Sequence, residues 1–212
     1  MSTIHHHIDD TSLASFAAGQ LSYPYAIVVA SHLAMCPSCR QTHASHMGVG
    51  GAVLDTLPEA EVSHDVKSGV MGMLDDTPAD PPAARLAPAL YPGPLSMFFG
   101  ETGPKWRNIG LATKQSILWE GDEGSVRLLH IPAGKPVPEH GHSGPEYTLV
   151  LKGNYQANGE VFGVGDLEIA DDDTDHTPTA GPEEPCICLA ATNAPLRFRS
   201  RVVSMIQPLL KI

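Results

Sequence analysis

The sequence predicts a two-domain α + β protein, with a small helical bundle at the N-terminus and an all-β domain after it. Apolar residues recur at helical spacing between residues 9 and 74, whereas later they fall in short β-rich segments separated by turn residues. Between the two parts, residues 77–94 contain six prolines, which a helix does not tolerate. The predicted boundaries are 1–76 for the helical domain, 77–94 for a proline-rich linker and 95–212 for the all-β domain.

Four helices are predicted in the first domain. Asp9 or Asp10 caps the first helix, because aspartate accepts hydrogen bonds from free amides at a helix start, and Gly19 is suited to end it. The second carries a wide apolar face. The other three helices are predicted at about residues 24–33, 37–57 and 63–74.

The second domain contains several short segments that are rich in β-forming residues. Turn residues such as Gly134, Gly153 and Gly163 fall between them. Many short strands with turns between them are typical of a sandwich or a small barrel. The clearest segments are residues 125–131, 147–151, 161–169 and 186–190.

The charge balance argues against direct binding to nucleic acid. The chain has 24 acidic and 13 basic residues, a net charge of −11, and no Lys/Arg cluster is visible. Both halves are acidic: residues 1–85 hold 9 acids and 3 bases, and the rest holds 15 and 10. A phosphate backbone would require a basic patch, so a basic protein partner is favoured.

The sequence also predicts a cytoplasmic protein. No basic region leads into an apolar stretch at the N-terminus, as it would in a signal peptide. Apolar runs such as Ala26 to Ala30 are far shorter than the ~20 residues that span a bilayer. In the reducing cytoplasm the four cysteines are expected to be metal ligands or free thiols rather than structural disulfides.

A first set of candidate metal ligands lies in the helical domain. His32 is followed by three residues, Cys36, two residues and Cys39, and positions four apart share one face of a helix. Structural zinc prefers four nitrogen or sulfur ligands, and one of the histidines at 5–7 can supply the fourth. The alternative is that this Cys-x2-Cys and the adjacent histidines are incidental.

A second set lies in the all-β domain, in a pattern of Gly134, His140, His142, Glu146 and Gly153. Residues two apart on a strand point to the same side, so His140 and His142 can point into a barrel together. The pattern resembles the first cupin motif, and this resemblance, rather than strand parity, makes Glu146 a ligand. The second cupin motif is degraded, with Asp171, Asp173 and Ala180 at positions where the family has other residues. Its metal ligand, His176, is kept.

The cupin resemblance implies a double-stranded β-helix barrel that holds a divalent metal through His140, His142, Glu146 and His176. Zinc is favoured, but such a ligand set also holds iron, manganese, nickel or copper. The alternative is an empty cupin.

The helical domain is similar to the zinc-binding anti-sigma domain over about residues 4–75. His7, 24 residues, His32, three residues, Cys36, two residues and Cys39 match the spacing of that family. The resemblance implies that His7, rather than His5 or His6, completes the zinc site. It also implies a helical bundle that binds a group IV (extracytoplasmic-function) sigma factor.

The combination of both domains resembles the ChrR type of anti-sigma factor over nearly the whole chain, including residues 137–142, 186–192 and 194–198. The resemblance implies that the helical domain suffices for inhibition. It also implies that the cupin domain is needed to release the sigma factor under singlet oxygen or organic hydroperoxide stress.

Cys186 and Cys188 form a candidate redox pair. On one strand their Cα atoms would lie roughly 6.5–7 Å apart, at the upper edge of disulfide reach. Oxidation of these sulfurs could disturb the cupin metal. Alternatively, they are two small buried core residues.

The sequence therefore predicts a zinc-dependent anti-sigma factor and not an enzyme. One alternative is a metal-dependent cupin enzyme of the dioxygenase or isomerase type, although no general base can be named beyond the ligands. Another is a cupin sensor that binds a small molecule without changing it. The particular sigma factor and the oligomeric state are left open.

Overall fold

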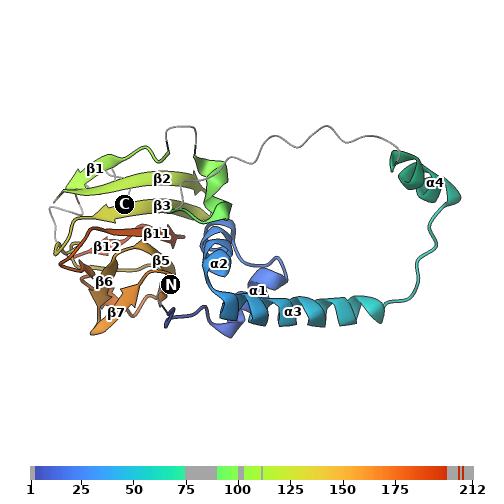
Figure 1. The fold of residues 1–212 in the computed structure, drawn as a ribbon, viewed down its shortest axis with the longest axis horizontal. Coiled ribbons are helices and arrows are strands. Elements are labelled where there is room, and N and C mark those ends of the chain that lie inside the picture. Colours follow the sequence, from blue (N-terminus) through green and yellow to red (C-terminus); the bar gives the residue numbers. More distant parts are fainter. Residues whose placement is uncertain are drawn as a thin grey trace.

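The computed structural model describes residues 3–74, 90–99, 103–110 and 112–199, together with Met205 and Gln207. Helices gather beside one wall of a β-barrel, and α4 stands well away from it (Figure 1). Among these residues no helix is both long enough and apolar enough to cross a membrane.

The four predicted helices are present. Asp9 is the cap of the first, where its carboxylate accepts a hydrogen bond from the amide of Ser12 at 2.8 Å. Gly19, with φ +67°, follows its last turn in the left-handed conformation that favours glycine. The helices are α1 (Asp10–Ala17), α2 (Tyr23–Met35), α3 (Pro37–Asp55) and α4 (His64–Met73).

Most of the predicted linker lies outside the described residues. Its last residues lead into a 3-10 helix, η1 (Gly93–Phe98), which packs against α2 and buries Leu95 completely. The domain boundaries stay predictions.

The second domain is a barrel of short antiparallel strands. A six-stranded sheet has the order β1-β2-β3-β11-β5-β8, and two three-stranded sheets have the orders β10-β6-β7 and β12-β4-β9. Its strands are β1 (Arg107–Gly110), β2 (Thr113–Gly121), β3 (Gly124–Ile131), β4 (His140–Gly141), β5 (Glu146–Lys152), β6 (Asn154–Ala157), β7 (Glu160–Gly163), β8 (Leu167–Ala170), β9 (Asp175–His176), β10 (Thr179–Ala180), β11 (Cys186–Thr192) and β12 (Arg197–Phe198).

One predicted strand was wrong in its extent. Residues 161–169 are divided into β7 and β8 by a tight turn in which the Asp166 carboxylate accepts a hydrogen bond from the Gly163 amide at 2.7 Å. Gly165 adopts φ +92° in this turn, a conformation that a continuous strand cannot contain.

The helical domain and the barrel share one apolar core. On β11, Ile187, Leu189 and Ala191 belong to the same buried cluster as Val28 and Val29 of α2. The intervening side chains of β11 point to the other side, into the barrel, because successive residues of a strand alternate. The central sheet therefore packs against α2 on its outer face and encloses the barrel interior on its inner face.

Two tyrosines reinforce this contact. The Tyr25 hydroxyl donates a hydrogen bond to the Pro145 carbonyl at 2.7 Å, and its ring lies 4.6 Å from that of Tyr147. The Tyr147 hydroxyl lies 2.6 Å from the Ser12 hydroxyl. Burial raises the pKa of Tyr25 to about 12 and also raises the pKa of Tyr147.

We expect this contact to be sensitive to alkali. A phenol whose pKa is raised by folding contributes stability that is complete below its unfolded pKa of ~10. For Tyr25 that contribution is lost as the pH rises through about 12. The free energy of unfolding, measured with urea between pH 8 and 11, should therefore fall more steeply with pH in the unmodified protein than in the Tyr25→Phe variant. Equal slopes would contradict the prediction.

Candidate metal centres

The first candidate metal centre lies where α2 meets α3. His32 is in the last turn of α2, Cys36 joins the two helices with an extended backbone, and Cys39 is in the first turn of α3. The Cys36 sulfur accepts a hydrogen bond from the Cys39 amide at 3.5 Å, so Cys36 also caps α3. Pro37 suits the first position of that helix.

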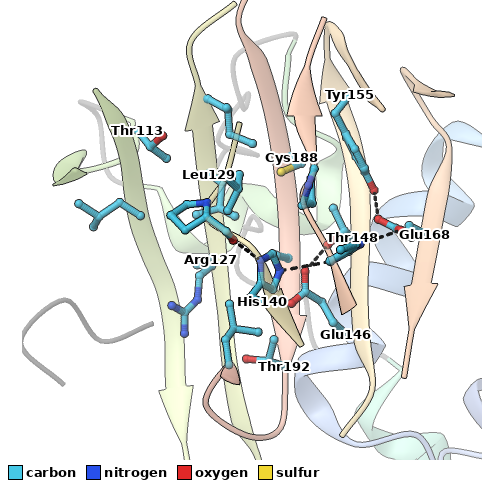
Figure 2. A pocket seen from close by; sticks show the side chains of 18 of the residues that line it. Thr113, Arg127, Leu129, His140, Glu146, Thr148, Tyr155, Glu168, Cys188 and Thr192 are labelled. Atoms are coloured by element: carbon cyan, nitrogen blue, oxygen red, sulfur yellow. Dashed lines mark hydrogen bonds and ion pairs between the residues drawn. The ribbon is translucent and has the colours of Figure 1, made fainter. Parts of the chain in front are cut away.

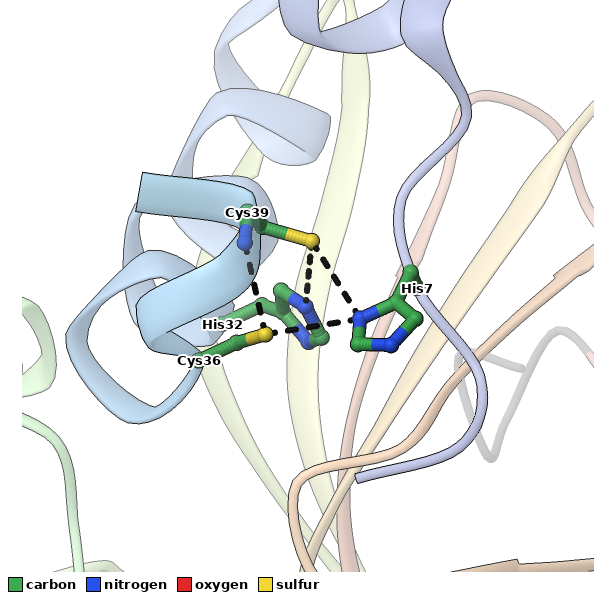
Figure 3. Close-up of side chains that lie close together, drawn as sticks. All are labelled: His7, His32, Cys36 and Cys39. Atoms are coloured by element: carbon green, nitrogen blue, oxygen red, sulfur yellow. Dashed lines mark hydrogen bonds between the residues drawn. The ribbon is translucent and has the colours of Figure 1, made fainter. Parts of the chain in front are cut away.

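His7 reaches this centre from a separate segment that precedes α1 (Figure 3). Its Nδ1 lies 3.4 Å from the Cys36 sulfur and 3.5 Å from the Cys39 sulfur. The Nε2 of His32 lies 3.3 Å from the Cys39 sulfur. The ligand atoms of all four residues lie within 4.8 Å of one another. His5 and His6 are not members of this group.

The protonation of this centre fits a zinc ion. Burial and the neighbouring His7 lower the pKa of His32 to about 4, which leaves the imidazole neutral and its Nε2 lone pair available. Burial raises the pKa of the Cys39 thiol to about 11, so zinc must displace its proton. Two sulfur and two imidazole donors are a usual set for structural zinc. Zinc binding by His7, His32, Cys36 and Cys39 stays a prediction.

The second candidate metal centre lies inside the barrel. β4 pairs with β9 so that His140 is opposite His176, and their Nε2 atoms lie 3.2 Å apart. The Nε2 of His142 lies 3.2 Å from that of His176. All three residues are buried. Three imidazole nitrogens that converge in this way fit a divalent metal.

The surroundings of these histidines orient them. The Nδ1 of His140 lies 2.8 Å from the Pro138 carbonyl, to which it donates, so its Nε2 presents a lone pair to the centre. Burial lowers the pKa of both His140 and His142, which favours the neutral forms that bind metals.

Glu146 lies beside the centre but is not among its mutually close ligand atoms. Its Oε2 is 3.4 Å from the Nδ1 of His142, which is the nitrogen that faces away from the other histidines. Its Oε1 accepts a hydrogen bond from the Thr148 hydroxyl at 2.9 Å. Ligation by Glu146 stays a prediction of the cupin resemblance.

Glu168 is a second carboxylate at this centre that the motif did not include. Its Oε1 lies 3.3 Å from the Nδ1 of His176, and its Oε2 accepts a hydrogen bond from the Tyr155 hydroxyl at 2.6 Å (Figure 2). Burial lowers the pKa of His176, but the hydrogen bond and charge of Glu168, together with the charges of Glu146 and Asp175, raise it overall. Successive residues of a strand point to opposite sides. In β8 Leu167 is buried in the shared core, so Glu168 points into the barrel, and this alternation was the signal that could have identified it.

A cavity of about 380 Å³ opens beside His140 and His176. Figure 2 shows Leu129, Arg127 and Cys188 around it, together with His140 and both carboxylates. Other parts of its wall are apolar, including Ile131, Val137, Leu196 and Phe198. A metal at one end and apolar walls elsewhere suit a small organic molecule with one polar group.

Cys186 and Cys188 are both free and buried on β11. The pKa of the Cys188 thiol is raised well above its ordinary value by the hydrogen bond that it donates to Cys186 and by burial. The reactive thiolate is therefore scarce at neutral pH, which makes direct oxidation slow. Cys188 also lines the cavity, where a small oxidant could reach it. A redox role of Cys186 and Cys188 stays a prediction.

Comparison with known proteins identifies the family. A model of the ChrR cupin-like domain matches residues 102–195. The chain is 42% identical to the anti-sigma-E factor ChrR of Cereibacter sphaeroides, with 99% of this chain and 100% of that protein covered. The chain belongs to the ChrR family of anti-sigma factors.

A solved structure of a ChrR protein has the same fold. It is the crystal structure of Rhodobacter sphaeroides SigE in complex with the anti-sigma ChrR. The match has 40% identity and a TM-score of 0.80, and it covers 90% of this chain and 100% of that one.

This membership confirms the predicted resemblance to ChrR-type anti-sigma factors, which are regulators rather than enzymes. It also confirms a helical region with a His/Cys cluster joined to a cupin.

Proposed function

We propose that this chain is a zinc-dependent anti-sigma factor that binds and inhibits a group IV sigma factor in the cytoplasm. The observation that carries the proposal is an unusually apolar exposed surface on the two helices that stand furthest from the barrel. We call it the apolar α3–α4 surface. It consists of Met47, Val49, Val53, Leu54, Val66, Val70, Met71 and Met73, each between 53% and 69% exposed.

This surface is suited to cover another protein. Val66, Val70 and Met73 are spaced at i, i+4 and i+7, so they form one stripe along α4. Large apolar side chains exposed in such numbers on a folded protein are typical of interaction sites. Methionine and valine side chains also fit a partner's apolar helices. The acidic balance of the chain favours a basic, DNA-binding partner. The relative of known structure is bound to SigE, which supports a sigma factor as the partner.

Zinc bound by His7, His32, Cys36 and Cys39 would fix the angle between α2 and α3. This angle sets where α3 projects from the barrel, and hence where the exposed apolar residues of α3 lie. Zinc stabilises small domains of this kind because the site does not exist in the unfolded chain.

The cupin domain would control release. We propose that His140, His142, Glu146 and His176 hold a second divalent metal, most simply zinc, and that the adjacent cavity admits an organic hydroperoxide. Its apolar wall suits the alkyl part of such a molecule. Oxidation of the barrel centre, at its metal or at Cys186 and Cys188, by a hydroperoxide or by singlet oxygen would then weaken binding of the sigma factor. A tenfold weakening requires about 1.4 kcal/mol of differential free energy between the two states.

The His140→Ala variant separates inhibition from release. We expect it to lose the barrel metal and keep about one zinc in the helical domain. Sigma affinity should change by less than about threefold, because the apolar α3–α4 surface is untouched. Addition of an organic hydroperoxide should dissociate the complex of the unmodified protein and leave that of the variant intact. Equal release from both would remove the cupin centre from the sensing step.

The test of the proposed function is binding of the full chain to sigma factors of its own host, with metal analysis of the same sample. Capture of one group IV sigma factor by a zinc-containing protein, and loss of transcription from its promoter, would support the assignment. A zinc-containing protein that binds none of these sigma factors would refute it.

A further inference from the structure

We propose that the barrel positions the zinc ligand His7, and that Asp166 and β8 connect the two metal centres. The inference rests on the proposed zinc site of the helical domain. His7 is the one proposed ligand of that site that lies outside the α2–α3 segment, so its position depends on what holds residues 4–8, which we call the N-terminal strap.

Asp166 holds the backbone of the strap directly before His7. One oxygen of its carboxylate accepts hydrogen bonds from the amides of His5 and His6, at 2.7 and 2.9 Å. The other oxygen accepts the hydrogen bond from Gly163 that shapes the β7–β8 turn. Asp166 is only 3% exposed, so water does not compete well for these donors.

The first residue of β8 continues this contact. The amide of Leu167 donates a hydrogen bond to the His6 carbonyl at 3.1 Å, so the strap is held by donors and acceptors on both sides of His6. The His6 ring packs on Phe162, with ring centroids 4.3 Å apart. Its Nδ1 also lies 3.5 Å from the second oxygen of Asp166.

Apolar contacts fix the two ends of the strap. Ile8 is buried in the shared core beyond His7. At the other end, Ile4 lies against Gly165 so closely that a Cβ on this glycine would be 2.6 Å from the Ile4 Cδ1. The backbone of His7 therefore lies between fixed points that belong largely to the barrel.

The same short stretch of chain reaches the other metal centre. Two residues after Asp166, Glu168 is 3.3 Å from the Nδ1 of His176. Carboxylates in this position orient metal-binding histidines. A change at the barrel centre that moves Glu168 acts on Leu167 and Asp166, and through them on the strap. β8 thus gives the barrel a physical route to the zinc site.

The first experiment compares zinc release to a chromogenic chelator from the full-length Asp166→Ala variant and the unmodified protein. Zinc bound at the helical site is quantified beforehand. We expect release about tenfold to a hundredfold faster, because two hydrogen bonds to a buried charge are lost. The matched control is Glu160→Gln, which alters an exposed carboxylate 3.7 Å from His6 and should release zinc at the unmodified rate.

A spectroscopic readout separates positioning from general loosening. With Co²⁺ at the helical site, the absorption bands report the ligands. We expect Asp166→Ala to shift the ligand-field bands toward those of a His7→Ala variant while the thiolate charge-transfer bands persist. The Asp166→Asn variant keeps one acceptor oxygen and should fall between the two. If Asp166→Ala misfolds, this variant carries the test, with its barrel metal content as the measure of an intact barrel.

The connection through β8 is tested by a double-mutant cycle. Glu168→Gln should speed zinc release in the unmodified background and have little further effect beside Asp166→Ala. Unchanged release and an unchanged Co²⁺ spectrum in a folded Asp166 variant would overturn the inference while leaving the anti-sigma assignment intact. Absence of zinc from the unmodified protein would instead refute the proposed zinc site, and this inference with it.

Discussion

Replacing Cys36 with alanine is expected to remove zinc from the helical domain and to weaken sigma binding at least ~100-fold. Cys36 is 1% exposed and stands at the junction of α2 and α3. Its sulfur lies close to His7 and accepts the amide hydrogen bond that caps α3. The substitution therefore removes a metal ligand and a helix cap together.

The large effect follows from the coupling between zinc and folding. Zinc binding in small structural sites amounts to roughly 10–16 kcal/mol, which exceeds the stability of most small domains. Without zinc, α3 and its exposed apolar residues lose their fixed direction. Metal analysis and a binding titration with labelled sigma factor measure the two consequences separately.

The control for this prediction is Cys188→Ala. Cys188 is also a buried cysteine, but it lies on β11 and lines the barrel cavity rather than the helical centre. This variant should keep the zinc of the helical domain and its sigma affinity. A Cys36→Ala protein with full zinc content and unchanged affinity would show that this cluster does not support binding.

The second large effect is expected from Val70→Asp on α4. Val70 is 56% exposed and lies in the middle of the apolar stripe formed with Val66 and Met73. A carboxylate that becomes buried against a partner without a compensating charge costs several kcal/mol. We expect the dissociation constant for the sigma factor to rise at least ~100-fold, which is about 2.7 kcal/mol.

Ser68→Asp provides a matched control two residues away. Ser68 is exposed on the same helix but faces away from the stripe, since two residues advance the helix by roughly 200°. Ser68→Asp adds the same charge as Val70→Asp and should alter the affinity for the sigma factor by less than about twofold. Because Val70 packs against no core in the free protein, zinc content and thermal stability should be unchanged in both variants. Equal affinities would exclude α4 from the interface.

The helices and the metal-ligand groups could be predicted because their signals are local. His32, Cys36 and Cys39 lie within eight residues, so their closeness in sequence already indicated one group, although the structure places a helix junction at Cys36. The choice of His7 required the family resemblance, because a distant ligand has no local signal. The structure places it in the group and places His5 and His6 on Asp166 instead.

What sequence patterns did not reveal were contacts between distant parts of the chain. The apolar face of α2 was predicted, but nothing local indicated that Leu189 and its neighbours on β11 would cover it. The role of Glu168 was missed for the same reason, because its partners His176 and Tyr155 lie on other strands. The turn that divides residues 161–169 is governed by the carboxylate of Asp166, which an apolar period of two does not report.

The shared core has a consequence for how this protein is made. α2 leaves the ribosome early, whereas β3, β5 and β11, which cover it, are synthesised later, with β11 near the end of the chain. Until then the nascent helical domain exposes two apolar surfaces, one that later packs against the barrel and one that is proposed to bind the sigma factor. Premature truncation before β11 would leave the first face uncovered for good, and such fragments should be prone to aggregate or to be degraded.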